Sequence, residues 1–507
     1  MLKQILSVGG WTLVSRLTGF VRDVVMAAVM GAGPVADAFV VAQRLPNHFR
    51  AIFGEGAFNS AFVPTYLALN GRDAGEARTF ADHTFTALLV VQVVLLAAAW
   101  AAMPWVVAAL APGFRADPAR FDLAVALTRI TFPYLLWITL VTFLSGVLNA
   151  HERFAAAAGA PVLLNVSLVA ALALAFLFPT AGHAAAWGVA VAGVLEYGLV
   201  WAAARRAGLA PRLARPRLDA AMRGFLRTLG LAVVGSAGVQ IAIFADTIIA
   251  SFLPTGGVSS FYYADRLYQL PVGIIGIAAG TVLLTTMSRR LAADDPGGAH
   301  AAQNRAVGFT LALAAPFLVA FLLVPDLIMR ALFGRGAFDE AAAGRAAAVL
   351  QAYAVGLPAV VLIRSATASF YSRRDTATPA LIVLAAVAVN VLLKVVLTDR
   401  LGAPGLALAT SAGNWVNLLL LAVFALRRGW TAPGPALGLT AAAVLAASVA
   451  LAAATWLADP ALAAALSGLT AWRDEARLGL LGLCGALVYA GALLLGLKLL
   501  GVGLRRA

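Results

Sequence analysis

Charged residues are scarce in this sequence. Asp, Glu, Lys and Arg make up only 12% of the 507 residues, about half the usual share in a soluble globular domain. Hydrophobic residues reach 62%, and the mean hydropathy is +0.91. Apolar runs long enough to cross a hydrocarbon core of about 30 Å recur along the whole chain, without the strict alternation of β-barrel strands. The composition therefore predicts an all-α polytopic membrane protein.

Cysteine and histidine are almost missing. The single cysteine, Cys484, cannot form an intrachain disulfide, and its apolar surroundings predict a buried thiol. The five histidines lie apart, and no HExxH, GxxxxGK[ST] or GxSxG motif occurs in a suitable context. These absences exclude the common zinc-dependent, ATP-driven and serine-hydrolase sites. They favour a transporter without a cofactor, driven by the membrane potential, an ion gradient or the gradient of its substrate.

The positive charge is unevenly distributed. The formal net charge is +14, and the densest basic run, residues 205–227, connects two apolar segments. Alternate connectors contain few Lys or Arg residues, which is the pattern of membrane proteins whose basic connectors face the cytoplasm. This topology explains the charge better than binding to nucleic acid does. Both termini are basic, and we expect both of them in the cytoplasm.

The apolar runs predict about fourteen membrane spans. Arg16 interrupts the first run, which we interpret as a retained helix rather than a cleaved signal peptide. The expected spans lie near residues 5–30, 35–68, 80–110, 122–149, 156–178, 184–204, 225–253, 259–288, 306–333, 341–370, 378–398, 404–426, 434–457 and 476–500.

The sequence repeats itself after about 220 residues. "AQRLP" at 42–46 aligns with "ADRLYQLP" at 264–271 at an offset of 222, and Arg153 aligns with Arg373 at 220. The offset covers an even number of spans, so the halves have parallel topology, related by an axis along the membrane normal. Transporters of this design bind substrate between the halves and alternate access by rocking.

The repeat also defines the expected domains. Two six-helix lobes are followed by two additional helices. We place the first lobe in residues 1–208, the second lobe in residues 209–430 and the additional helices in residues 431–507.

Several charged residues lie inside the predicted spans. A cation at the centre of a bilayer costs roughly 2.5–3.5 kcal/mol on insertion scales, so these residues are expected to face the protein interior. The set comprises Arg16, Arg22, Asp23, Asp37, Arg44, Arg50, Glu55, Asp265, Arg266, Arg364 and Lys394.

The arginines of this set outnumber its acids. Internal ion pairs that hold the bundle together are one interpretation, and they would satisfy some of the guanidinium groups. The surplus favours an anionic ligand, because the planar guanidinium group matches the oxygens of a phosphate or carboxylate. The spans therefore predict a water-filled, arginine-lined cavity that binds a diphosphate or a carboxylate-rich substrate.

A second polar cluster combines Asp246, Asn390, Lys394 and Thr410. The oxygens of Asp, Asn and Thr are suitable Na⁺ ligands, but Lys394 adds a positive charge where a further ligand would be needed. An Asp246–Lys394 ion pair or a proton-linked switch is the preferred interpretation, and a cation site stays the alternative.

Seven motifs along the chain resemble one family. They are "SRLTGFVRD", "DAFVVAQRLPNHFRAIFGEGAFNSAFVP", "APGF", "TFPYLL", "LNAHERF", "YYADRLYQLP" and "FYSRRDTATP". Together they are similar to the MurJ (MviN) lipid II flippases of the multidrug/oligosaccharidyl-lipid/polysaccharide exporter superfamily. The resemblance implies a multi-pass protein of the bacterial inner membrane, with fourteen helices around a central cavity. It also implies flipping of lipid II, the undecaprenyl-diphosphate-linked MurNAc-pentapeptide-GlcNAc, from the cytoplasmic to the periplasmic leaflet.

The resemblance also assigns roles to residues. It implies substrate-binding functions for Arg16, Arg22, Arg50 and Arg266, accompanied by Asp23, Asp37 and Glu55, with Arg44 and Arg364 at further basic positions. The last two helices resemble those that form a groove for the lipid tail in this family. Expected partners are lipid II, membrane lipids and the cell-wall synthesis machinery. Neutral Gln269 and basic Lys394 depart from the family pattern.

Three alternatives remain. An exporter of another polyprenyl-diphosphate-linked sugar, such as an O-antigen unit, would use the same arginines. A cation or drug antiporter should have acidic and aromatic residues in its cavity instead. A scaffold without transport activity would have no need of cavity arginines.

Overall fold

The computed structural model is helical along the chain, as the composition predicts. It describes residues 2–52, 58–469 and 471–502, and no strand occurs among them. Side chains are not described at residues 2–7, 45, 48–52, 234–242, 277–279 and 281. The chain falls into two compact units, residues 1–259 with 336–338, and residues 260–335 with 339–507.

The first unit contains the helices α1 to α10. Within it α8 packs against both α1 and α9, α7 packs against α9, and α2 packs against α6. The bounds are α1 (Leu2–Met30), α2 (Pro34–Ile52), α3 (Phe58–Asn70), α4 (Ala74–Ala101), α5 (Met103–Leu110), α6 (Pro118–Thr131), α7 (Tyr134–Ala150), α8 (Ala155–Ala173), α9 (Ala181–Arg206) and α10 (Ala220–Ala250).

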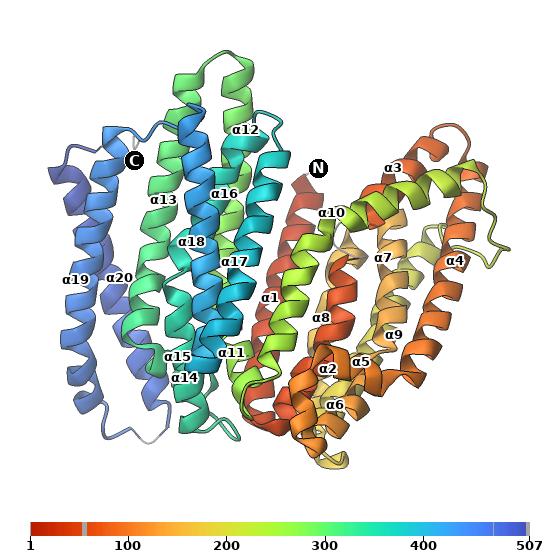
Figure 1. Ribbon diagram of the computed structural model, residues 1–507, viewed down its shortest axis with the longest axis horizontal. Coiled ribbons are helices and arrows are strands. Elements are labelled where there is room, and N and C mark those ends of the chain that lie inside the picture. The colour runs from red at the N-terminus through yellow and green to blue at the C-terminus, as the bar shows by residue number, and fades with distance from the viewer. Residues whose placement is uncertain (1, 53–57, 470, 503–507) are drawn as a thin grey trace. The chain divides into compact units, whose positions relative to one another are not determined.

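The second unit begins inside α11 and contains the helices that follow. The long helices α13, α17, α18, α19 and α20 run side by side (Figure 1), with α17 packed on α18 and α19 packed on both α13 and α20. The bounds are α11 (Gly257–Pro271), α12 (Ile277–Ala292), α13 (Pro296–Leu323), α14 (Pro325–Phe333), α15 (Glu340–Ala354), α16 (Leu357–Tyr371), α17 (Ala377–Leu401), α18 (Ala403–Arg427), α19 (Pro435–Ala465) and α20 (Arg473–Leu499).

Every predicted span coincides with helix, but several spans are broken. Span 80–110 forms α4 and α5, and span 306–333 forms α13 and α14, which has Pro325 at its first position. Proline is favoured there because the first helical N–H has no partner within the helix. By length and composition, ten helical stretches among the described residues suffice to cross a membrane. Fourteen crossings stay a prediction.

The internal repeat is visible in the helix caps. Asp73 caps α4 and Asp295 caps α13, each by accepting a hydrogen bond from a backbone N–H group of the first turn. Asp117 and Asp339 cap α6 and α15 in the same way. The members of each pair stand 222 positions apart. The starts of α8 and α17 and of α9 and α18 keep this spacing, so the offset of 220 from the Arg153–Arg373 alignment is two residues too short.

Two loops of the repeat make matching contacts within the first unit. Gly113 of the "APGF" loop lies against the end of α10, where a Cβ atom would be only 2.5 Å from the Ser251 carbonyl oxygen. In the other repeat, the Ala337 N–H donates to the Ala28 carbonyl of α1 at 2.7 Å. The preceding Gly336 has a φ of +58°, a conformation that glycine adopts without strain. Each loop therefore docks on the first helix of the other repeat.

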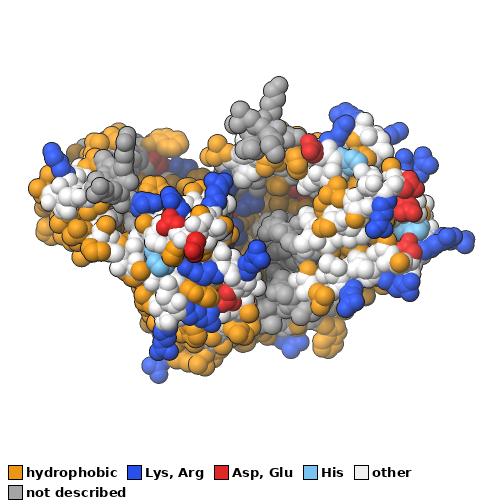
Figure 2. All heavy atoms as spheres, turned by 90° about the horizontal axis from the view of Figure 1, so that it is seen from above, with side chains coloured by type: hydrophobic (Ala, Val, Ile, Leu, Met, Phe, Trp, Pro, Cys, Tyr) orange, Lys and Arg blue, Asp and Glu red, His pale blue; other side chains and the backbone are white. Residues whose placement is uncertain are grey.

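The α12–α13 connection of the second unit lies at the top of Figure 1. Figure 2, the view from above, shows more blue Lys and Arg side chains than red Asp and Glu side chains on the atoms it displays. Arg289 and Arg290, both exposed, lie in the last turn of α12. Cys484 is exposed on α20, so the expectation of a buried thiol is wrong. An apolar run facing lipid and one facing a core have the same composition.

Candidate functional site

The charged residues in the middle of α1 form a hydrogen-bonded cluster with α8. The Arg22 Nε and Nη2 atoms donate to Asp23 Oδ1 at 3.0 and 2.7 Å. The Nη1 atom donates to Asn165 Oδ1 of α8 at 2.9 Å. The Arg22 side chain keeps 12% of its surface exposed, against 5% for the Asp23 side chain. Arg22 is thus held from two sides while it stays accessible.

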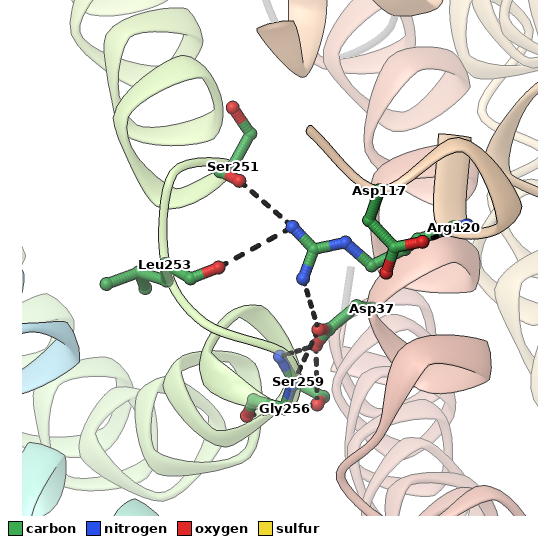
Figure 3. A network of polar contacts seen from close by, with 7 residues as sticks. All are labelled: Asp37, Asp117, Arg120, Ser251, Leu253, Gly256 and Ser259. Atoms are coloured by element: carbon green, nitrogen blue, oxygen red, sulfur yellow. Dashed lines mark hydrogen bonds and ion pairs between the residues drawn. The ribbon is translucent and has the colours of Figure 1, made fainter. Parts of the chain in front are cut away.

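A second acid–arginine pair connects α2 with α6 and is buried. Asp37 is 0% exposed, and its Oδ2 atom lies 3.4 Å from the Nη1 atom of Arg120, which is 5% exposed. Asp37 Oδ1 accepts from the backbone N–H of Ser259 at 2.8 Å and from its hydroxyl at 2.7 Å, and Oδ2 accepts from the Gly256 N–H at 2.7 Å. The carboxylate therefore has an arginine on one side and the start of α11, with the preceding Gly256, on the other (Figure 3).

Arg120 is the centre of this second network. Its Nη2 atom donates to the Ser251 carbonyl at 3.1 Å and to the Leu253 carbonyl at 3.5 Å (Figure 3). The guanidinium carbon lies 3.8 Å from the centre of the Phe114 ring, a cation–π contact. Asp117 fixes the start of α6 by accepting from the Arg120 N–H at 3.2 Å. Asp37 and Ser259 stand 222 positions apart, so Asp37 binds its own counterpart in the other repeat.

Two further arginines of the predicted set make described side-chain contacts, one with a neighbouring helix and one within its own helix. The Arg44 Nη1 atom of α2 donates to the Thr247 hydroxyl of α10 at 3.2 Å. The Arg266 guanidinium carbon of α11 lies 4.7 Å from the centre of the Tyr262 ring, one turn earlier. Both arginines are half-buried.

The remaining arginines of the set are exposed or outside the described side chains. Arg16 is exposed on α1, and Arg364 is exposed on α16. A Cβ atom at Gly280 of α12 would lie 3.0 Å from the Arg364 Cβ, so these two helices pack closely there. The side chain of Arg50, and Glu55 altogether, lie outside the described residues.

The second predicted cluster divides between the units. Asp246 lies on α10 of the first unit, and the other three residues lie on α17 and α18 of the second. Lys394 is 1% exposed. Asn390 Oδ1 is buried and has no hydrogen-bond partner among the described residues, while the Thr410 hydroxyl donates to the Leu406 carbonyl. The Asp246–Lys394 pair and the cation site both stay predictions.

Sequence reasoning missed two residues of these networks, Arg120 and Asn165. The predicted span began at residue 122, which placed Arg120 in a connector, whereas α6 begins at Pro118. An arginine three positions after the helix cap Asp117 gave no reason to expect burial. Asn165 is a single amide in an apolar helix, and such a residue was a usable signal, because amides buried in membrane helices need partners.

Sequence comparison identifies the family. The profile of the lipid II flippase MurJ family matches residues 26–468. The chain belongs to this family. A relative from Rhizobium meliloti (strain 1021), named probable lipid II flippase MurJ, is 42% identical over 503 residues, covering 97% of this chain and 92% of the relative. The lipid II flippase MurJ of Burkholderia cenocepacia is 35% identical over 443 residues, covering 86% of both chains.

Solved structures show the same fold. A structure described as lipid II flippase MurJ in an inward closed conformation matches with a TM-score of 0.80 and 22% identity, covering 97% of this chain and 98% of that chain. A multidrug-resistance MATE transporter of the MOP superfamily matches with a TM-score of 0.62 and 15% identity, covering 84% and 94%. The expected fold class is therefore confirmed, and MATE transporters share it with the MurJ family.

Proposed function

We propose that this protein is a lipid II flippase that moves undecaprenyl-diphosphate-linked peptidoglycan precursor from the cytoplasmic to the periplasmic leaflet. The observation that carries this proposal is the match over nearly the whole chain to a relative of that name at 42% identity. Such a protein is a transporter and not an enzyme, because it changes the position of its substrate without breaking a bond.

The membrane-embedded arginines supply the binding chemistry in this proposal. A diphosphate linked to a lipid and a sugar carries two negative charges, which guanidinium groups bind through paired N–H donors. Exposed Arg16 and Arg364, with half-buried Arg22, Arg44 and Arg266, are the described candidates. Arg50 and Glu55 belong to the same proposed set by resemblance. These residues line a central cavity that opens alternately to each side.

The Asp37 network has a different role in the proposal. It joins α2 and α6 of the first repeat to the connection between α10 and α11 of the second repeat. When the repeats rock, the contacts that close one side of the cavity form as the opposite side opens. The Asp37–Arg120–Ser259 hydrogen bonds therefore stabilise one state of the transport cycle and are released in the other.

The membrane potential is the proposed driving force. An anion that moves out of a cell with a negative interior gains about 2.3 kcal/mol per charge for every 100 mV that it crosses. The emptied cationic cavity is returned inward by the same field. This direction requires the basic connectors and both termini to be cytoplasmic. The extra helices α19 and α20 form the proposed groove for the lipid tail, and enzymes of cell-wall synthesis are the proposed partners.

Lipid II translocation in proteoliposomes tests the proposal. Wild type is compared with Arg22→Ala at equal insertion, with labelled lipid II in the inner leaflet and a membrane-impermeant quencher outside. We expect translocation by wild type and none by the variant. Movement of another polyprenyl-diphosphate-linked sugar, without movement of lipid II, would reject the substrate and keep the arginine chemistry.

A further inference from the structure

Asn165 lies on α8 and directs its whole side-chain amide at α1. The residue is 5% exposed. Its Nδ2 atom donates to the Ser15 carbonyl and to the Thr18 hydroxyl oxygen, both at 3.0 Å. Its Oδ1 atom accepts from Arg22 Nη1 at 2.9 Å. All three contacts are to residues within two turns of α1.

These partners permit only one orientation of the amide. A backbone carbonyl can only accept a hydrogen bond, and an arginine can only donate one. The Ser15 carbonyl therefore binds the NH₂ group, and the amide oxygen must face Arg22. The Thr18 hydroxyl donates to the Val14 carbonyl at 2.8 Å, so its oxygen is available to accept from Asn165. The α1 backbone thus determines where the acceptor for Arg22 lies.

Asp23 holds the same guanidinium group from another direction, through Nε and Nη2. With Asn165 on Nη1, acceptors from two helices fix the plane of the group rather than only its distance from α1. A flexible arginine would lose side-chain entropy on binding a ligand, and a group that is already oriented loses less.

We propose that Asn165 is a positioning residue for transport, which holds the Arg22 guanidinium in the orientation that receives the substrate diphosphate. This inference rests on the proposed function. Asn165 acts through Arg22 and does not itself touch the substrate. Asn165 and Ser167 are the only polar residues of α8, so Ser167 serves as a control position on the same helix.

A double-mutant cycle tests this role. Asn165→Leu has a similar volume but no hydrogen-bonding groups, and Arg22→Lys keeps the charge but loses the planar fork. The KM and the maximal rate of lipid II translocation are measured in proteoliposomes for wild type, both single variants and the double variant. The unfolding temperature of each protein is measured in parallel.

We expect Asn165→Leu to raise the KM about tenfold in the wild-type background and less than about twofold in the Arg22→Lys background, because residues that act through one contact are not additive. Ser167→Ala should leave the KM unchanged. An equal rise of the KM in both backgrounds would overturn the inference, as would a lowered unfolding temperature with an unchanged KM.

The experiment also has a second variant, and it separates failure of the proposed function from failure of this inference. If Asn165→Leu does not fold, Thr18→Val replaces it in the same cycle, since it removes one anchor of the amide and leaves the Arg22 contact. If wild type moves no lipid II, the proposed function fails and this inference fails with it. If wild type moves lipid II and the cycle is additive, only the role of Asn165 is rejected.

Discussion

Two acid–arginine pairs in the first unit differ in what surrounds them. Arg22 and Asp23 are neighbours on one helix, and Arg22 keeps part of its surface exposed. Asp37 and Arg120 come from different helices, and both are nearly inaccessible. In the first pair the arginine is the accessible partner, oriented by Asp23 and Asn165. In the second pair the carboxylate accepts from N–H groups of Gly256 and of Ser259, at the start of α11.

In the proposed mechanism, this difference separates the residues that bind substrate from those that control conformation. A guanidinium group that is accessible and already oriented can bind an anion at little entropic cost. A guanidinium group that is buried against two backbone carbonyls, an aromatic ring and a carboxylate cannot reach a ligand without breaking those contacts. We propose, therefore, that the same residue types serve two purposes, and that burial decides which.

The largest expected effect is on transport, at the Arg22–Asp23 pair of α1. Arg22→Ala should abolish lipid II translocation in protein that still folds and inserts, because the guanidinium group that binds the diphosphate is lost, and the unfolding temperature in detergent checks the folding. Arg266→Ala should behave in the same way. Arg22→Lys is the control that keeps the charge, and we expect partial activity from it. Normal translocation by both alanine variants would contradict the anion-binding role.

The second largest effect is on the stability of the buried pair. Asp37→Ala leaves the Arg120 charge buried without its carboxylate, which should cost about 3–5 kcal/mol in the free energy of unfolding. Equilibrium unfolding in detergent micelles measures this loss. The double variant Asp37→Leu with Arg120→Met should lose less, since no charge stays buried. Equal losses in the two proteins would show that the ion pair itself is unimportant.

A smaller effect is expected from one hydroxyl group of the buried network. Ser259→Ala removes the Oγ–Asp37 hydrogen bond but keeps the backbone N–H contact, so it should cost about 0.6 kcal/mol and at most about 1.7 kcal/mol. Ser260→Ala is the matched control, because the Ser260 hydroxyl is buried without a hydrogen-bond partner among the described residues. If Ser260→Ala costs as much as Ser259→Ala, the loss of stability does not come from the Oγ–Asp37 hydrogen bond.

The smallest effect is expected at the anchor of Asn165. Thr18→Val removes one of two acceptors for the amide, and a single hydrogen bond of about 0.5–1 kcal/mol corresponds to a two- to fivefold change. The KM for lipid II should rise by that factor, with the maximal rate nearly unchanged. Translocation rates measured over a range of lipid II concentrations in proteoliposomes give the KM and check this factor. A lowered unfolding temperature with an unchanged KM would assign Thr18 to packing alone.

Much of the architecture followed from the sequence. Long apolar runs predicted helices because a backbone in lipid must satisfy its own hydrogen bonds, and every predicted span contains helix. The repeat was detectable because "AQRLP" and "ADRLYQLP" recur at an offset of 222, the spacing that the helix caps share. The charges of α1 were recognised as functional candidates because a charged side chain in an apolar span is costly unless it faces the interior of the protein.

The partners of those charges depended on the tertiary structure. The sequence placed Asp37 and Arg44 in one set of charges within the spans, yet Asp37 pairs with Arg120 and Arg44 contacts Thr247. Likewise, nothing local placed Asn165 beside Arg22, 143 positions earlier. The sequence alone determined that the chain forms a bundle of apolar helices that carry charged residues within their spans, since hydropathy and charge are local properties. Only the packing of α1 on α8 and of α2 on α6 decided which arginine stays accessible, because burial is a property of neighbours that are distant in sequence.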